Sequence, residues 1–279
     1  MDIDFYKIVS GQNDLILINF LKIDFPNLEL LLPLTRSLCN RRSGVGGNGV
    51  LILLPSEKET LKLRYFRPDG QESVLLNDAL LCLARYIFDS GMASTVMTVE
   101  TIRGIRRVEL LDSRNFRLNL GSPLAYNLNP LKPDPDIDFS ELIRLQDRNL
   151  SMVPLFLGKK GAAFLDGGQY RGRRKEIIKN LKNLSNKEDS PHPIFVTIRE
   201  RDEIGVDSPL DRLNSDNVSS CALGGSAAVL SGLTENELLI RSRRSRYYYE
   251  WDSDTNSVFI TGSADYAFSG SFYFDEGMD

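Results

Sequence analysis

The sequence has few of the residues on which metal and disulfide chemistry depends. Its 279 residues include one histidine, His192, and three cysteines, Cys39, Cys82 and Cys221. A single histidine without a close pair of cysteines argues against a zinc site, and no metal is expected. Three widely spaced cysteines do not form a disulfide framework, which indicates the reducing cytoplasm as the location. His192 stands between two prolines and is expected in a loop.

Charge and hydropathy argue against two further classes of protein. The formal net charge of -4 provides no overall attraction to nucleic acid or to an anionic membrane, so neither is expected as a partner. No apolar run reaches the roughly 20 residues that a membrane span needs. The first residues also lack the basic and then apolar pattern of a signal peptide. With 42% apolar residues, a chain of this length is expected to bury a core and to form two domains.

An internal repeat predicts the fold. Two helices rich in small apolar residues are expected near 78–90 and 222–232, and three strand-like runs follow each of them. The runs are 95–100, 105–111 and 115–120 in the first half, and 237–241, 246–251 and 257–261 in the second. Both helices are apolar nearly all round, so each should be enclosed. The pattern predicts an α+β fold with two pseudo-symmetric domains, each a mixed or antiparallel, barrel-like sheet around a central helix.

Prolines and polar runs predict the domain boundaries. We expect an N-terminal domain over 1–125, a proline-rich linker over 126–140 and a C-terminal domain over 141–279. An alternative is that the final strand of the chain returns to the N-terminal domain and pairs there. A polar surface loop is expected at 183–190, after a basic helix at 172–184. A cleft between the domains, with both helix N-termini facing it, suits a small carboxylate ligand.

Three other patterns have ordinary structural explanations. Gly44-x-Gly46-x-x-Gly49 matches a dinucleotide fingerprint literally, but a strand rather than a helix follows it at 50–54, so this function is rejected. The basic runs 171–175 and 241–246 are expected to be solvated faces, with phosphate or an acidic partner as the alternative. Within 247–251, alternate tyrosines of a strand face opposite ways, which favours core packing over a stacking platform.

Five glycine-containing segments follow one another along the chain: Gly11-Gln-Asn13-Asp14, Arg41-Arg-Ser-Gly44-Val-Gly46-Gly47-Asn48-Gly49, Tyr65-Phe-Arg67-Pro-Asp69-Gly70, Thr261-Gly262-Ser263-Ala264 and Phe268-Ser-Gly270. In this order they resemble segments of the diaminopimelate epimerase family. The resemblance covers most of the chain and implies a pair of α+β domains related by a pseudo-twofold axis. It also implies an isomerase class that inverts an amino-acid α-carbon without pyridoxal phosphate, so no cofactor is expected. Family members serve bacterial lysine and peptidoglycan precursor synthesis.

The same resemblance places the family's functional residues. One thiolate removes the α-proton and a thiol on the opposite face supplies another, because a single base returns the proton to the face it left. The family's first cysteine matches Leu76, whereas its second matches Cys221, the candidate catalytic residue here. Cys82 aligns with a packing cysteine of the family.

The ligand-binding candidates also follow from the resemblance. They are Asn13, Asp211, Arg212, Gly224 and Gly225, where Asp211-Arg212 matches a Glu-Arg pair after a shift of one residue. The family's ligand asparagine near 67 is replaced by Arg67, and its Gly-Asn-Pro-His segment by Gly158-Lys159-Lys160-Gly161. Asp78 is a weaker catalytic candidate, because an Asn or Asp at the start of a helix is more often an N-cap. For Cys221 the alternative is a small buried packing residue.

Three functions remain open. The first is a pseudoenzyme, whose cleft binds a small amino-acid or dicarboxylate ligand, or a partner, without two-base epimerisation. The second is a one-base isomerase or eliminase that uses Cys221, alone or with Asp78. The third is a genuine diaminopimelate epimerase whose first cysteine lies elsewhere in the alignment. A homodimer is compatible with each of them.

Overall fold

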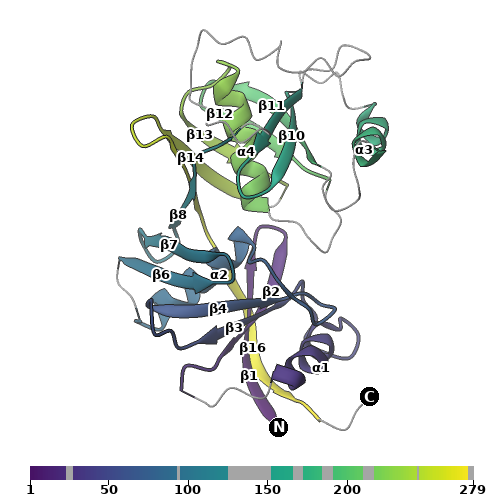
Figure 1. The fold of residues 1–279 in the computed structure, drawn as a ribbon, viewed down its shortest axis with the longest axis vertical. Coiled ribbons are helices and arrows are strands. Elements are labelled where there is room, and N and C mark those ends of the chain that lie inside the picture. The colour runs from purple at the N-terminus through teal and green to yellow at the C-terminus, as the bar shows by residue number, and fades with distance from the viewer. Residues whose placement is uncertain are drawn as a thin grey trace. The chain divides into compact units, whose positions relative to one another are not determined.

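The computed structural model describes residues 1–22, 28–92, 95–124, 152–165, 172–183, 191–209, 217–243 and 245–275. Contacts between Cα atoms divide the chain into two compact units. The first contains Met1–Leu118 and Gly262–Asp279, and the second contains Asn119–Leu210 and Asn217–Thr261. Each unit is built from a mixed sheet and two helices among the described residues (Figure 1). The expected linker over 126–140 and the loop at 184–190 lie outside the described residues.

The first unit is a sheet in which β1 and β2 lie next to the last strand of the chain. Its strands are β1 (Asp2–Ser10), β2 (Asn13–Asn19), β3 (Val50–Leu54), β4 (Leu61–Phe66), β5 (Glu72–Ser73), β6 (Val96–Thr101), β7 (Gly104–Leu110), β8 (Phe116–Gly121) and β16 (Asp265–Tyr273). The order is β16-β1-β2-β3-β4-β6-β7-β8, with β5 paired to β4. The β2–β3 and β4–β6 pairs are parallel and the others are antiparallel.

Two helices cover apolar faces of this unit. Helix α2 (Asn77–Asp89) contacts β1, β2 and β7, and most of its side chains are buried. Helix α1 (Leu28–Cys39) packs Leu31, Leu34 and Leu38 into a cluster with residues of β1, β2 and β3. The sequence analysis predicted α2 and the strands at 95–120, and these elements are confirmed. It missed α1, which contains Pro33 in its second turn.

The second unit repeats this plan around a more deeply buried helix. Its strands are β9 (Met152–Phe156), β10 (Lys160–Leu165), β11 (His192–Glu200), β12 (Glu203–Asp207), β13 (Glu237–Arg241), β14 (Arg246–Asp252) and β15 (Ser257–Gly262). The order is β15-β14-β13-β12-β11-β10-β9, with parallel β10–β11 and β12–β13 pairs. Every residue of α4 (Asn217–Leu230) is buried, and the helix contacts each strand from β9 to β14. Helix α3 (Arg174–Asn183) packs Ile177 and Leu181 against Phe164 and Phe195.

These observations confirm the predicted α+β class and the packing expected of the tyrosine run, and they correct one detail. The tyrosine run lies in β14, where Tyr247, Tyr249 and Trp251 are buried while Tyr248 is 43% exposed, as alternation in a strand requires. The prediction that His192 lies in a loop is wrong. His192 begins β11 and pairs with Gly161 of β10, because the prolines on either side of it precede or occupy the first positions of the strand, where a missing N–H is tolerated.

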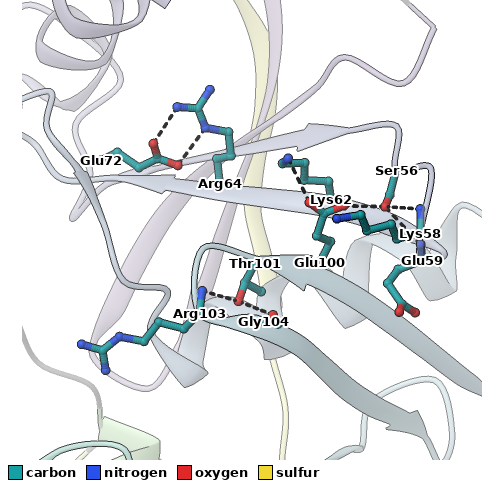
Figure 2. Close-up of polar contacts among 10 residues, drawn as sticks. All are labelled: Ser56, Lys58, Glu59, Lys62, Arg64, Glu72, Glu100, Thr101, Arg103 and Gly104. Carbon is teal, nitrogen blue, oxygen red and sulfur yellow. Dashed lines mark hydrogen bonds and ion pairs between the residues drawn. The ribbon is translucent and has the colours of Figure 1, made fainter.

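The outer part of the first unit carries ordered polar contacts between neighbouring strands. Figure 2 shows that Arg64 of β4 makes two hydrogen bonds to Glu72 of β5, of 2.7 and 2.6 Å. In the same view Glu100 of β6 accepts a hydrogen bond from Ser56 Oγ at 2.7 Å and pairs with Lys62 at 3.0 Å. The Ser56 hydrogen bond is the main cause that lowers the pKa of Glu100. These contacts tie β4, β5 and β6 together, next to the segment that leads into α2.

Candidate functional site

The residue at the start of α2 is a leucine. Leu76 is the N-cap, with an extended backbone (φ -73°, ψ 146°), and it makes no side-chain capping bond. Its side chain is half-buried, and its carbonyl accepts a hydrogen bond from the amide of Ala79 at 3.0 Å. The interpretation of Asn77 or Asp78 as the N-cap is therefore wrong. Both lie inside the helix, and Asn77 Oδ1 accepts a bond from Arg106 Nη2 at 2.8 Å.

Asp78 lies in the first turn of α2 and has no exposed surface. Its Oδ2 accepts a hydrogen bond of 3.2 Å from Nδ2 of Asn13, the first residue of β2, which is 1% exposed. The structure therefore brings together two of the sequence candidates, Asp78 and Asn13. Burial of a carboxylate is costly unless hydrogen bonds stabilise it, and the Asn13 amide supplies one of these bonds to Asp78.

The glycine-rich segment between α1 and β3 reaches the same place. Asn48 Nδ2 donates to Asn13 Oδ1 at 3.1 Å, and Asn48 Oδ1 accepts from Arg41 Nη2 at 2.7 Å. Gly49 lies against β4 so closely that a Cβ atom there would be 2.4 Å from the ring of Tyr65. The segment leads into β3 and opens no helix, as expected, and its glycines serve close packing rather than a dinucleotide.

Arg41 and Lys7 converge on Asp14, the neighbour of Asn13. Arg41 makes two hydrogen bonds to the Asp14 carboxylate, of 2.9 and 2.7 Å, and Lys7 Nζ lies 2.9 Å from Oδ2. Lys7 also donates to the carbonyl of Gly46. Burial favours a higher pKa for Asp14, but the two cations outweigh it and hold the pKa below its usual value. Burial is the main cause that lowers the pKa of Lys7, although its ion pair with Asp14 opposes this.

Cys221 belongs to the second unit, and its position in the helix differs from the prediction. We expected α4 to begin at 222 with the thiol at its N-terminus. The helix begins at Asn217, so four helical residues precede Cys221, whose side chain has no exposed surface. The sequence did not predict this first turn, because Asn and Ser favour caps and turns over helix interiors. Here tertiary contacts hold them, since Asn217 Nδ2 donates to the hydroxyl of Tyr247 at 3.1 Å.

The two glycines after Cys221 lie in the helix interior against strand side chains. A Cβ atom on Gly224 would be 2.9 Å from Val206, and one on Gly225 would be 2.7 Å from the ring of Tyr249. Glycine therefore permits α4 to approach β12 and β14 closely. A role for these glycines in ligand binding stays a prediction. Asp211 and Arg212 lie outside the described residues.

A lysine that the sequence analysis did not select reaches the start of α4. Lys159 follows Gly158 in the turn between β9 and β10, and its Nζ donates to Ser220 Oγ at 3.0 Å. Ser220 directly precedes Cys221. The segment was identified as a departure from the family's Gly-Asn-Pro-His, and the replacement of a neutral amide by lysine was the signal for this contact.

The basic runs are matched by carboxylates where the structure describes them. Arg174 and Arg243 both pair with Asp207, at 2.5 and 3.2 Å. Arg241 makes two bonds to Glu203, of 2.7 and 3.0 Å. Arg171 and Arg244 lie outside the described residues. Arg174 also lies over the ring of Phe195, 4.6 Å from its centroid, so this arginine is packed as well as paired. The interpretation of the basic runs as solvated faces stays a prediction.

Two larger features are absent from the part of the chain that the structure describes. No group of three or more histidine, cysteine or carboxylate side chains in this part of the chain has an arrangement that holds a metal ion. Of the helices that the structure describes, none is long and apolar enough to cross a membrane.

Known proteins resemble this chain over nearly its whole length. No protein-family model matches it. The diaminopimelate epimerase of Brachyspira hyodysenteriae is 27% identical over 281 residues, which cover 97% of this chain and 99% of that protein. The diaminopimelate epimerase of Desulforudis audaxviator is 28% identical over 284 residues, covering 96% and 99%.

Solved structures share the fold at lower identity. A phenazine biosynthesis protein of the PhzF family from Enterococcus faecalis matches with a TM-score of 0.69 at 13% identity, covering 98% of this chain and 100% of that one. A hydroxyproline epimerase from Agrobacterium vitis, solved with trans-4-hydroxy-L-proline bound, matches with a TM-score of 0.59 at 15% identity, covering 97% and 91%. The predicted fold and resemblance are confirmed: over nearly its whole length the chain is similar to proteins named diaminopimelate epimerase, and it shares the fold of these solved structures.

Proposed function

We propose that this protein binds a small amino-acid or dicarboxylate ligand and no longer carries out two-base epimerisation. The observation that supports this most directly is Leu76 at the N-cap of α2, the position that matches the family's first thiol. Inversion at a carbon requires one group that removes a proton and another that supplies one from the opposite face. A leucine side chain does neither.

Asp78 is a poor substitute for the missing thiol. It is fully buried and its carboxylate accepts the Asn13 hydrogen bond. A general base must reach the proton it removes, through about 3 Å or a single water molecule. Asp78 therefore has a structural role beside Asn13, and neither Asp78 nor Leu76 transfers a proton.

The ligand class follows from relatives and from charge. The sequence relatives are named for diaminopimelate, and one structural relative holds an amino acid, trans-4-hydroxy-L-proline. In this chain the ammonium of Lys159 lies beside the first turn of α4, where the helix end carries a partial positive charge. A carboxylate group on the ligand complements both. Cysteine usage supports the cytoplasm as the proposed location.

The decisive experiment measures α-proton exchange and inversion separately. The protein is incubated with LL- or meso-diaminopimelate in D₂O, and deuterium at the α-carbon and the ratio of stereoisomers are followed by NMR. Loss of one acid/base group typically slows the reaction by about a hundred- to ten-thousandfold. We expect neither exchange nor inversion at a useful rate, whereas calorimetry with the same compounds should detect binding.

Two variants sharpen this test. Leu76→Cys restores a thiol at the N-cap of α2 and should raise the exchange rate above that of the protein itself, while Leu76→Ala, the matched control, should not.

Inversion by the unmodified protein would show that it is an active epimerase. Exchange without inversion would favour the second candidate, a one-base isomerase; the observation in its favour is the Lys159 ammonium beside the residue that precedes Cys221.

A further inference from the structure

Four side chains of the first unit form a continuous line of hydrogen bonds from the surface to a buried carboxylate. Arg41, which is 59% exposed at its side chain, donates to Asn48 at 2.7 Å. Asn48 donates to Asn13 at 3.1 Å, and Asn13 donates to Asp78 at 3.2 Å. We refer to Arg41, Asn48, Asn13 and Asp78 as the amide relay. It joins a guanidinium to a fully buried carboxylate through two asparagine amides.

The guanidinium at the exposed end determines the direction of every bond in the relay. A guanidinium only donates, whereas an asparagine amide donates or accepts, depending on which way it is turned. Since Arg41 donates, the oxygen of Asn48 must face it, which turns the nitrogen of Asn48 toward Asn13. Asn13 must then present its oxygen to Asn48 and its nitrogen to Asp78. Reversing either amide would break two bonds at once.

The surroundings of the relay hold its middle and its exposed end in place. The hydroxyl of Tyr65 donates to the carbonyl of Asn48 at 3.0 Å, which fixes the backbone of that residue. Arg41 makes two bonds to Asp14, so its guanidinium has little freedom to turn away from Asn48. The relay is thus anchored at three points on β2, β4 and α2.

We propose that Asp78 and Asn48 are positioning residues that orient the amide of Asn13 in the ligand site, and that Asp78 is not a base. The inference rests on the proposed function for the ligand, but the orientation of Asn13 is a property of the protein alone. With its oxygen committed to Asn48, the Asn13 amide presents its nitrogen on the α2 side. Asp78 and Asn48 thereby hold this amide in one orientation.

The first measurement needs no ligand. In protein labelled with ¹⁵N-asparagine, the side-chain amide of Asn13, assigned through Asn13→Ser, should exchange with water more slowly than an exposed asparagine amide. Asp78→Leu and Asn48→Ala should each shift this signal and speed its exchange. Asp78→Asn should largely preserve it, because the new amide oxygen can accept the same hydrogen bond. Asp89→Leu, at the other end of α2 and outside the relay, is the matched control and should leave the signal unchanged.

The second measurement uses meso-diaminopimelate as the probe, with affinity measured by calorimetry. Loss of one buried hydrogen bond corresponds to about a tenfold change in affinity. Asp78→Leu and Asn48→Ala should weaken binding by about that factor, while Asp78→Asn and Asp89→Leu should bind within about threefold of the unmodified protein. Asn48→Ala keeps the test valid if Asp78→Leu does not fold.

The two measurements separate the failure of each idea. An Asn13 signal that is the same in Asp78→Leu, Asn48→Ala and the unmodified protein overturns the relay. Proton exchange on the probe that is present in the protein and abolished by Asp78→Asn shows that Asp78 is a base, and also overturns it. If the unmodified protein does not bind the probe, the proposed ligand class fails, while the NMR result still decides whether the relay orients Asn13.

Discussion

Cys39, the last residue of α1, is a buried thiol whose titration affects stability. Burial raises its pKa from the usual 9.0 to about 12. Between these two values the unfolded chain loses a proton that the folded protein keeps. The free energy of unfolding should therefore fall as the pH rises above 9, by up to about 1.4 kcal/mol per pH unit from this group, and should not respond to it below pH 9.

Cys39→Ser removes this titration, so the decline between pH 9 and 11 should be shallower in the variant. Urea unfolding at pH 8, 9, 10 and 11 measures the difference. Thr35→Ser is the control, because Thr35 is also a buried residue of α1 and does not titrate in this range. Parallel curves for Cys39→Ser and the unmodified protein would show that the thiol ionises normally in the folded state.

The position of Cys221 inside α4 predicts that its thiol is unreactive in the folded protein. Alkylation requires a thiolate that the reagent can reach, and Cys221 and Cys82 are both fully buried. Iodoacetamide at neutral pH should modify both slowly and at similar rates, and quickly once urea unfolds the chain. Mass spectrometry of peptides after timed labelling checks this. Rapid labelling of Cys221 alone would show an exposed, activated thiol, as the expected helix start at 222 had implied.

At the scale of secondary structure, α4 depends on the two glycines that face the sheet. Replacing Gly225 by alanine should gain about 1 kcal/mol from helix propensity but force a Cβ atom against Tyr249. Overpacking of this kind costs about 1–3 kcal/mol, so we expect a net loss of stability. Gly172→Ala is the matched control, because a Cβ atom there meets nothing within 4 Å. Urea unfolding compares the two; equal stability would mean that Tyr249 moves aside without cost.

The same elements show how far sequence reasoning extends. The strand runs after α2 and α4 were predictable because their apolar alternation ends at glycine and aspartate turns. Helix α1 was missed, because it contains Pro33 and an internal proline normally breaks a helix. The Asn13–Asp78 contact was also not predictable, because its two residues lie 65 positions apart and meet only where α2 packs against β2.

At the scale of the whole molecule, the first unit is completed by the end of the chain. Strand β16 pairs antiparallel with β1 over Asp2–Val9, and the amide of Phe274 donates to the carbonyl of Met1 at 2.8 Å. A chain that ends after Ala264 lacks this strand, so its first unit should lose stability. Trp251, the one tryptophan of the sequence, is 2% exposed in the second unit and reports on that unit.

We therefore expect the shortened chain to lose part of its far-ultraviolet circular dichroism while its tryptophan emission stays typical of a buried ring. A chain that ends after Asp275 is the control and should match the unmodified protein in both signals. If the tryptophan emission of the shortened chain shifts to that of an exposed ring without denaturant, the second unit does not stay folded when the first loses β16.

The pairing of β1 with β16 has a consequence for how the gene can be rearranged. Because Met1 and Phe274 are hydrogen-bonded neighbours, a short linker can join the two ends of the chain, and new ends can be opened elsewhere. In a circular permutant that starts at Gly262, the segment from Gly262 onward comes first, the linker follows, and Met1–Leu118 and the remaining residues up to Thr261 come last. Among the described residues, the two units, interleaved in the natural order, would then follow one another along the chain, which allows each to be exchanged with the matching half of a relative.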